Sequence, residues 1–274
     1  MTIEDISRKR AAFRELHRTG CFVLPNPWDI GSAKLLARHG FKALATTSAG
    51  HAWSQGRADG QLSCAEVLDH IRAMVGSTDL PINADFESGF AETAEGVFDN
   101  VSMALETGVA GISIEDSTGD PSSPLREIGE AADRMMAARA AIDAAGGGVM
   151  LTGRAENFFV GRPDLEDTLS RLKVYAEAGA DCLYAPGIKT REQIRAVVAA
   201  VAPKPVNVLI GWDSDFTRQD LADLGVCRVS LGGALARAAW GGFMKSMLAL
   251  AEEGRFEGFG TAPSGAELNS LFRK

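Results

Sequence analysis

Short apolar runs alternate with longer amphipathic segments along almost the whole chain. The apolar runs begin near Cys21, Lys42, Pro81, Ala110, Val149, Ala180, Pro205 and Cys227. The amphipathic segments between them include 94–106, 130–144, 165–178 and 191–201. In the third of these, one apolar face is formed at helical spacing by Leu165, Leu169, Leu172 and Ala176. The alternation predicts eight parallel strands, each followed by a helix.

A glycine separates a helical segment from the next strand at four places, Gly40, Gly108, Gly179 and Gly225. Glycine enters the left-handed backbone region without a steric penalty, so it commonly ends a helix. Because the chain has 30 glycines, chance placement is the alternative. The recurrence of the same context favours a repeated helix-to-strand connection.

These repeats predict a single domain over residues 1–274 with the α/β fold of a TIM-type (β/α)8 barrel. The chemistry of such barrels lies at the carboxyl ends of the strands. A doubly wound open sheet is the competing fold, but no G-x-G-x-x-G motif follows the first strand. The length of 274 residues is normal for one barrel.

Residues 234–274 follow the eighth strand and are predicted to be a helical tail used in oligomerisation. The segment 234–253 is rich in Ala and Leu and carries apolar residues on more than one face. A final helix on its own barrel is the plainer interpretation, and a helix that packs on another subunit is the second. The adjacent Gly241 and Gly242 favour a break where the tail would leave the barrel.

Three neighbouring strand candidates end on charged side chains. Asp85 and Glu87 follow the third strand, Glu115 follows the fourth and Arg154 the fifth. Parallel strands bring their carboxyl ends together, so we expect these side chains to share a pocket, with Asp85 and Glu87 on one face of their strand. The three carboxylates suit Mg²⁺ as metal ligands, and Arg154 suits a substrate carboxylate. A structural ion pair between Arg154 and the acids is the alternative.

Two further segments are predicted to line the pocket. The second strand ends in small and hydroxyl residues, and Thr47, Ser48 and Ala49 are predicted to bind an anionic oxygen of the substrate. A plain Ser/Thr-rich turn is the alternative. Asp59 follows in a loop expected to fold over the pocket, although a loop carboxylate is by default solvated. Among the histidines, only His51 is expected near the pocket.

The other histidines and the cysteines are expected to be structural. The histidines show no metal-ligand spacing, and three fall on helices as surface or capping groups, namely His17, His39 and His70. The cysteines form no C-x-x-C pair and have no electropositive setting, so we expect unreactive thiols at Cys21, Cys64, Cys182 and Cys227.

Composition narrows the class of protein further. Hydrophobic residues make up 46% of the chain and charged residues 23%, as in globular proteins. The net charge of −8 argues against a nucleic-acid partner. The amino-terminal residues contain no apolar signal segment, and no apolar run reaches the ~20 residues of a membrane span. We therefore expect a cytoplasmic protein without a membrane partner.

The order of these motifs resembles the isocitrate lyase/phosphoenolpyruvate mutase superfamily. Residues 47–50 are similar to its oxyanion-binding turn, and residues 56–59 to its gating loop. Residues 84–90, A-D-F-E-S-G-F, resemble its Asp-x-Asp/Glu-x-Gly-Tyr/Phe signature. Residues 114–116 resemble its second metal motif and residues 153–156 its arginine strand. The likeness extends from P-N-P-W-D, in the first strand region, to the C-terminal helix.

The resemblance implies Mg²⁺ held by the carboxylates largely through water, beside a bound 2-oxo or 2-hydroxy acid. Such enzymes make or break a C–C or P–C bond next to the enolate of a pyruvate-like unit. The metal and the N–H groups of the turn would stabilise the developing negative oxygen, while Arg154 holds the carboxylate. We predict Asp59, Asp85 and Arg154 as catalytic residues. The superfamily's final helix usually crosses to a neighbouring subunit, which implies a homodimer or homotetramer.

Two sequence motifs of the superfamily are missing from this chain, and their absence narrows the choice of reaction. The isocitrate-type lyases carry a Lys-Lys/Arg-Cys-Gly-His loop whose Cys donates a proton, but residues 117–125 read S-T-G-D-P-S-S-P-L. The Lys-x-Asn-Ser element of the phosphonate-bond members is absent as well. The first prediction is a Mg²⁺-dependent lyase or decarboxylase-type enzyme acting on a small 2-oxo or 2-hydroxy acid through an enolate. A phosphonopyruvate-type mutase or hydrolase and a non-catalytic 2-oxo-acid binding protein are the alternatives.

Overall fold

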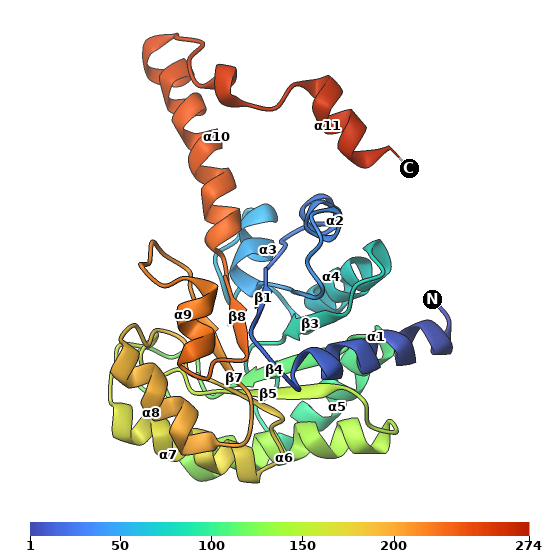
Figure 1. The fold of residues 1–274 in the computed structure, drawn as a ribbon, viewed down its shortest axis with the longest axis vertical. Coiled ribbons are helices and arrows are strands. Elements are labelled where there is room, and N and C mark those ends of the chain that lie inside the picture. The colour runs from blue at the N-terminus through green and yellow to red at the C-terminus, as the bar shows by residue number, and fades with distance from the viewer. Residues whose placement is uncertain (274) are drawn as a thin grey trace.

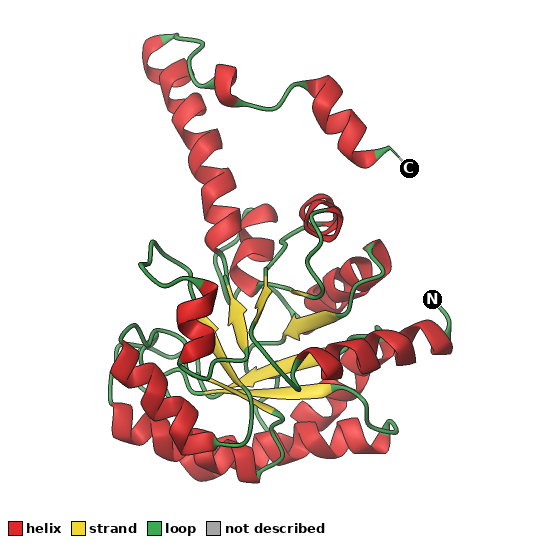
Figure 2. Ribbon diagram, viewed as in Figure 1, coloured by secondary structure: helices red, strands yellow, loops and turns green. Residues whose placement is uncertain are grey.

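Eight parallel strands form the centre of the molecule, as seen in a computed structural model that describes residues 1–273. The strands are drawn as arrows in Figure 1 and coloured yellow in Figure 2. Every one of them begins within two residues of its predicted start. Their bounds are β1 (Phe22–Leu24), β2 (Leu44–Ala45), β3 (Ile82–Asp85), β4 (Gly111–Glu115), β5 (Met150–Arg154), β6 (Cys182–Tyr184), β7 (Val206–Leu209) and β8 (Arg228–Ser230).

The strand order confirms a TIM-type barrel and excludes the doubly wound sheet. Neighbouring strands run in the order β1-β8-β7-β6-β5-β4-β3-β2, so the first strand pairs with the last. The barrel is nearly closed, because β1 and β2 form no ladder. A single backbone hydrogen bond from the Ala45 N–H to the Pro25 carbonyl, 3.0 Å long, joins their ends.

Helices follow the strands around the outside of the barrel (Figure 2). The predicted segments 94–106 and 191–201 agree with the observed helices at both ends, while the predicted 130–144 helix begins two residues earlier. The helices are α1 (Ile3–Leu16), α2 (Ile30–Arg38), α3 (Ser48–Ser54), α4 (Cys64–Ser77), α5 (Ala94–Glu106), α6 (Ile128–Ala144), α7 (Leu165–Glu177), α8 (Arg191–Val201), α9 (Arg218–Asp223), α10 (Ala234–Glu253) and α11 (Gly265–Phe272), with the short 3-10 helix η1 (Phe259–Thr261).

The four predicted helix-ending glycines all adopt positive φ angles, between 84° and 106°. Gly179 shows why the connection also needs a small residue. A Cβ atom there would lie 2.6 Å from Cγ of Arg139, which is closer than real contacts allow. The glycine therefore supplies both the left-handed turn and the close approach of α7 to α6.

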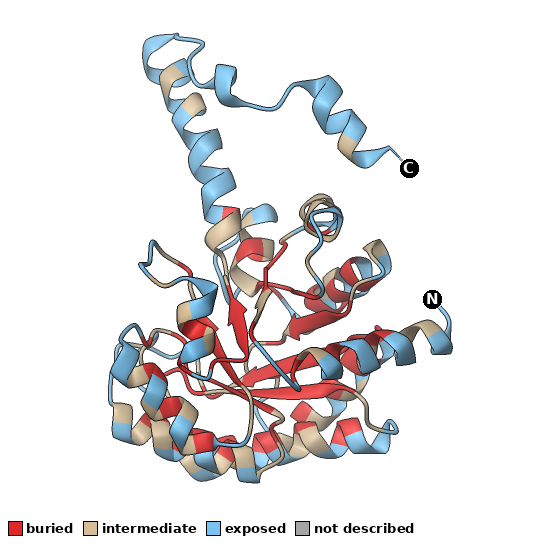
Figure 3. Cartoon of the chain, viewed as in Figure 1, coloured by how far each residue is buried: buried red, intermediate tan, exposed pale blue. Residues whose placement is uncertain are grey.

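The buried side chains lie on the strands and on the inner faces of the surrounding helices (Figure 3). Helix α1 packs on the amino ends of the strands, where the fully buried Phe13 belongs to a cluster with Leu24, Ala45 and Met150. His17, at the end of this helix, is buried rather than a surface group. Its Nδ1 lies 2.8 Å from the Phe13 carbonyl and its Nε2 3.3 Å from a guanidinium nitrogen of Arg228. The contact with Arg228 joins the helix to the barrel interior, which the sequence pattern of one helix could not reveal.

Helix α10 projects from the barrel as a long arm, and beyond it the chain turns back so that α11 lies over α2 (Figure 1), where Arg38 donates to the carbonyl of Leu271 at 2.7 Å. Only Ala236 of this helix is buried, while large apolar side chains remain exposed at Trp240, Phe243, Met244, Met247, Leu248 and Leu250. The predicted break at Gly241 and Gly242 is wrong, because the helix runs through both residues with right-handed backbone. Glycine lowers the stability of a helix only modestly, so the helix can continue through both glycines.

None of the helices over residues 1–273 combines the length and the apolar character needed to cross a membrane.

Candidate active site

A cavity of about 620 Å³ opens at the carboxyl ends of the strands. The last residue of every strand except β4 lines it. This is the end of the barrel where the sequence placed the chemistry. The lining side chains include Asn26, Thr46, Thr47, Ser48, Ala49, Trp53, Asp59, Asp85, Arg154, Tyr184, Lys189, Trp212, Arg228 and Arg237.

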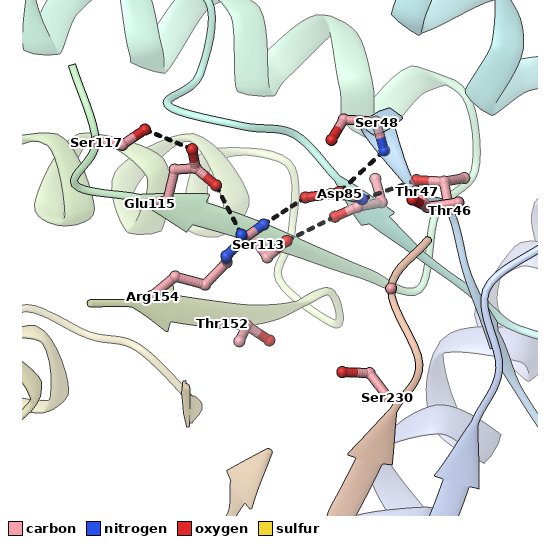
Figure 4. Close-up of polar contacts among 12 residues, drawn as sticks. Thr46, Thr47, Ser48, Asp85, Ser113, Glu115, Ser117, Thr152, Arg154 and Ser230 are labelled. Atoms are coloured by element: carbon pink, nitrogen blue, oxygen red, sulfur yellow. Dashed lines mark hydrogen bonds and ion pairs between the residues drawn. The ribbon is translucent and has the colours of Figure 1, made fainter. Parts of the chain in front are cut away.

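Arg154 is the centre of the charged cluster (Figure 4). One terminal nitrogen lies 2.6 Å from an oxygen of Asp85, and the other lies 2.9 Å from Glu115. Glu156, two residues further along the chain, accepts hydrogen bonds from the same guanidinium at 2.9 Å. Burial alone lowers the pKa of Arg154, but Glu115, Glu156 and Asp85 raise it well above the ordinary value. The predicted convergence of Asp85, Glu115 and Arg154 is therefore present, and Glu156 adds an acid that was not predicted.

Asp85 is held from two sides at the end of β3. Its second carboxylate oxygen accepts a hydrogen bond from the backbone N–H of Ser48, 3.0 Å away. Its own N–H donates to the hydroxyl of Thr46 at 2.8 Å. Figure 4 shows this chain of contacts running from the start of α3 to Arg154. The segment predicted to bind an anion thus already binds one, the carboxylate of Asp85.

Glu87 lies beyond the end of the strand, so the strand alternation that predicted it on one face with Asp85 does not apply to it. Strand β3 ends at Asp85, and Glu87 has a left-handed backbone with φ of 45°. The turn buries Phe86 completely and is closed by a hydrogen bond from the Gly89 N–H to the Phe86 carbonyl. Glu87 is not among the residues that line the cavity. Burial, then the charges of Asp85 and Glu115, raise the pKa of Glu87 to about 8.

Glu115 and Glu156 are buried beside the same guanidinium. Burial raises the pKa of Glu115, although Arg154 and a 2.6 Å hydrogen bond from the Ser117 hydroxyl oppose the shift. Burial also raises the pKa of Glu156 to about 8, again opposed by Arg154. Three carboxylates, of Asp85, Glu115 and Glu156, contact the guanidinium of Arg154, so the cluster holds more negative charge than one guanidinium neutralises.

This excess of acid fits a divalent cation. The donors are carboxylate oxygens, which hard cations such as Mg²⁺ prefer. Within residues 1–273, however, no three Asp, Glu, His or Cys side chains are arranged to hold a metal ion directly. Mg²⁺ commonly keeps several waters and takes only one or two carboxylates, so the cluster fits a largely water-mediated site.

The other predicted site residues lie at the cavity wall. Thr47 caps the amino end of α3, its hydroxyl accepting a hydrogen bond from Gly50, while Ser48 and Ala49 form the first turn. The N–H groups of a first helical turn lack partners within the helix and are available to acceptors outside it. Asp59 lines the cavity from the exposed loop after α3. All four residues are thus brought to the same cavity as Asp85 and Arg154.

The loop that lacks the catalytic Cys lies elsewhere. Within residues 117–125, Ser122 to Leu125 line a separate surface depression beside Asn157 and Arg171. Asp116, just before the loop, points into the protein and is 2% exposed. Its carboxylate accepts hydrogen bonds from Tyr175 at 2.5 Å and from the Glu156 N–H at 2.8 Å, and pairs with Arg171 at 3.1 Å. Asp116, the second acid of the Glu-Asp motif, therefore has a structural role behind the site.

The histidines and cysteines stay outside the cavity. His51 stacks on His70, with ring centroids 3.6 Å apart, so His70 is half-buried between α3 and α4 instead of being a surface group. His39 is exposed, as expected. Three of the free cysteines are buried and Cys64 is half-buried, and none lines the cavity.

Several cavity residues were not predicted because they come from the later strands. The guanidinium of Arg154 lies 5.2 Å from the ring centre of Tyr184, the last residue of β6. On the cavity floor the buried Arg228 donates to the Asn207 side chain at 2.8 Å and to Thr152 at 3.1 Å. The signal for these residues was a polar side chain at alternate positions of an otherwise apolar run, as in V-N-V-L and R-V-S.

Comparison with known protein families and sequences gives matches over most of the chain. The family described as phosphoenolpyruvate phosphomutase matches residues 13–251. An uncharacterized protein of Mycobacterium tuberculosis (strain ATCC 25618 / H37Rv) is 31% identical over 223 residues, covering 81% of either chain. Oxaloacetate decarboxylase of Rhodopseudomonas palustris (strain BisA53) is 28% identical over 163 residues, covering 56% of this chain and 54% of that enzyme.

Solved structures extend the likeness to the whole barrel. A Burkholderia cenocepacia J2315 protein, provisionally assigned as a lyase or mutase, superposes with a TM-score of 0.95 at 44% identity over 98% of this chain and 97% of its own. Oxaloacetate acetylhydrolase in complex with its product oxalate superposes with a TM-score of 0.85 at 22% identity over 97% of this chain and 94% of its own. At the latter identity the likeness shows the fold alone.

Proposed function

Since the chain belongs to the phosphoenolpyruvate phosphomutase family, within the isocitrate lyase/phosphoenolpyruvate mutase superfamily of enzymes, we propose that it is a Mg²⁺-dependent lyase or decarboxylase. Its substrate is a small 2-oxo or 2-hydroxy carboxylic acid that reacts through an enolate. The carrying observation is the cluster of Arg154 with Asp85 and Glu115 at the carboxyl ends of the strands, where Arg154 and Asp85 line the cavity. The cluster offers carboxylate oxygens as ligands for a hard metal ion such as Mg²⁺, and beside them a guanidinium that can bind the carboxylate of a substrate.

We assign a separate role in the reaction to each group of site residues. Asp85, Glu87 and Glu115 would hold the cation, largely through water, and Mg²⁺ bound there would supply an electrophile that stabilises negative charge on the substrate oxygen. Arg154 holds and orients the carboxylate of the pyruvate-like unit. In the first turn of α3, the N–H of Ala49 is offered to the oxygen that becomes negative, while the N–H of Ser48 holds the carboxylate of Asp85.

Asp59 stands where a proton can be held or moved, since it faces the cavity from a loop that is exposed to solvent. The loop 117–125 supplies no Cys, and neither Ser123 nor Asp116 lines the cavity. We therefore assign the proton to Asp59 or to water at the site, in place of a loop thiol. General-acid help from a positioned group is worth roughly 10²–10⁴-fold in rate.

The curated relatives favour cleavage of a C–C bond over a P–C bond. Oxaloacetate decarboxylases recur among them, and the chain lacks the Lys-x-Asn-Ser element of the phosphonate-bond members. These enzymes share 27–29% identity with the chain over about half to two-thirds of their own length. A decarboxylase-type or retro-aldol reaction therefore leads the proposal.

A turnover screen with and without Mg²⁺ tests the proposal. The panel contains oxaloacetate, 2-alkylmalates, isocitrate and phosphonopyruvate, and the Asp85→Asn variant serves as the inactive control. We expect Mg²⁺-dependent release of CO₂ or of a 2-oxo acid, with little glyoxylate from isocitrate. Phosphate or a rearranged phosphonate as the main product would support the mutase or hydrolase alternative. Tight binding of 2-oxo acids without any product would support the binding-protein alternative.

A further inference from the structure

The charges that line the cavity are unevenly distributed between its two ends. At the end formed by β3 and β5, Arg154 is paired with three carboxylates, of which that of Asp85 also lines the cavity. At the mouth, Lys189 and Arg237 line the same cavity, and no carboxylate within residues 1–273 forms an ion pair with either. The acidic end is the one that suits a metal, whereas the mouth carries positive charge that the protein itself does not neutralise.

The two mouth cations are held in place by their surroundings. The ammonium of Lys189 lies 4.7 Å from the ring centre of Trp212, within the distance of a cation–π contact. The guanidinium of Arg237, at the start of α10, donates to the carbonyl of Gly211. Gly211 and Trp212 are neighbours in the loop after β7, so one loop positions both cations.

Aromatic rings complete the mouth. Trp53 of α3 lies against Gly233, where a Cβ atom would meet its ring at 3.0 Å, and Phe158 lies beside Gly187, where a Cβ atom would meet the Cβ of Phe158 at 2.7 Å. Both rings line the cavity together with Trp212. Rigid aromatic walls with few polar atoms are suited to a flat or apolar ligand body.

The size of the cavity also indicates a ligand larger than a small 2-oxo acid. Its volume of about 620 Å³ is much larger than a small 2-oxo acid fills. Cavities of ~300–1,000 Å³ ordinarily enclose ligands of drug size. If the reacting end of the substrate lies at Arg154, the remaining space runs past the aromatic walls to the mouth cations.

We propose, on the basis of the function proposed above, that the natural substrate is an elongated dianion. Its reacting end is the 2-oxo or 2-hydroxy acid at Arg154, its body is apolar and lies between Trp53 and Trp212, and its far end carries a second anionic group. Lys189 and Arg237 bind this second group. The two cations are thereby the residues that determine which tail the enzyme accepts.

Equilibrium binding of two matched probes tests the inference. Phenylpyruvate and its para-carboxylated derivative share the reacting end and the aromatic body, and they differ only in the far anion. Calorimetry in the presence of Mg²⁺ should show about tenfold tighter binding of the carboxylated probe to the wild type, because two cations gain an anionic partner. The preference should shrink as salt is raised, since charges at a solvent-exposed mouth are screened.

Variants of Lys189 and Arg237 then test whether these two residues cause the preference for the carboxylated probe. Lys189→Met should reduce the ratio of the two affinities severalfold, and the Lys189→Met/Arg237→Met double variant should bring it close to one. Lys173→Met, which removes an exposed lysine on the outer face of α7, should leave the ratio as in the wild type. Because Arg237 also contacts Gly211, the single Lys189 variant keeps the test valid if the double variant folds poorly.

Oxalate separates the failure of the inference from the failure of the proposed function. Wild-type protein that binds oxalate with Mg²⁺, but shows no preference between the two aromatic probes, contradicts the elongated dianion alone. A preference that survives in the Lys189→Met variant and in the double variant also contradicts it. Wild-type protein that binds neither oxalate nor either probe overturns the proposed function and the inference with it.

Discussion

The hydroxyl of Tyr175 donates a hydrogen bond of 2.5 Å to the buried carboxylate of Asp116. Arg171 approaches the same carboxylate oxygen at 3.1 Å, and the other oxygen accepts from the Glu156 N–H. Asp116 thus ties α7 to the ends of β4 and β5, directly behind the charged cluster. Its neighbour Glu115 pairs with Arg154. Of these two adjacent acids, Asp116 thus contributes to packing and Glu115 to the charged cluster of the site.

We expect Tyr175→Phe to lower the free energy of unfolding by about 1–3 kcal/mol, because a buried carboxylate loses a donor. Asp116→Asn should cost more, because it leaves the Arg171 guanidinium without its buried charge partner. Urea unfolding at a fixed protein concentration measures both changes. Turnover per folded molecule should stay close to the wild type in Tyr175→Phe. A variant of normal stability that has lost turnover would show that Tyr175 acts in the reaction.

Asp85→Asn should weaken Mg²⁺ binding about tenfold or more, because it removes a carboxylate from the strand end at the centre of the cluster. Calorimetric titration of Mg²⁺ in the presence of oxalate measures the affinity. Asp133→Asn, at an exposed position of α6, is the matched control for the loss of one negative charge. Equal Mg²⁺ affinities in the wild type and Asp85→Asn would remove Asp85 from the metal site.

Arg154→Lys should weaken the binding of oxalate by about 1–3 kcal/mol, because lysine lacks the planar fork that binds a carboxylate at two points. The titration is carried out at saturating Mg²⁺, so that a change in metal affinity does not enter. Unchanged oxalate affinity together with lowered stability would identify Arg154 as a structural partner of Asp85, Glu115 and Glu156. That was the alternative open from the sequence, and the three short contacts make the test necessary.

His17 should make the fold sensitive to acid. Burial, then the charge of Arg228, lowers the pKa of His17 to about 3, so the folded protein binds its proton less readily than the unfolded chain does. Its contribution to stability is complete above the unfolded pKa of ~6.5 and is lost as the pH falls towards 3. The loss between pH 7 and pH 5 should be about 2 kcal/mol.

The pH dependence is assigned by comparing variants. His17→Gln keeps an acceptor for Arg228 and a donor for the Phe13 carbonyl but does not titrate. Its free energy of unfolding should fall less steeply between pH 7 and pH 5 than that of the wild type. His39→Gln, at an exposed histidine, controls for the loss of a titrating ring. Parallel pH profiles for His17→Gln and the wild type would show that His17 does not contribute.

The exposed apolar face of α10 should be covered by a second subunit. Six large apolar side chains of this helix are between 37% and 59% exposed, and its single buried residue is Ala236. We expect sedimentation to find a dimer or a dimer of dimers over a wide range of dilution, since the uncovered arm would not be stable in water. A folded monomer at high dilution, or a variant truncated before Gly241 that remains a soluble dimer, would contradict the exchange of this helix.

The sequence predicted the barrel because its signals are local. The apolar period of a strand or helix and the left-handed glycine at a helix end depend on neighbouring residues, so the eight strands and Gly179 could be located. The ends of β3, β4 and β5 followed from the topology, which brought Asp85, Glu115 and Arg154 together.

The remaining features depend on contacts between distant segments. Glu87 lies outside the strand of Asp85 because a turn around the buried Phe86 ends that strand, and strand alternation contains no information about the turn. Asp116 is recognised as a packing group only when Tyr175 and Arg171 of α7 are placed against it. Lys189 lies in the loop after β6 and Arg237 at the start of α10, and only the assembled barrel brings both to one cavity.

The closure of the barrel has a consequence for synthesis on the ribosome. Strand β1 forms its ladder with β8, Phe22 opposite Arg228, and touches β2 through the one hydrogen bond between Ala45 and Pro25. The first strand to be translated therefore has no ladder partner until the last one has been released. Pairing between such distant segments is slow, and open strand edges favour aggregation in the meantime. A nascent chain stalled before Arg228 is an open half-cylinder, with the edges of β2 and β7 unprotected.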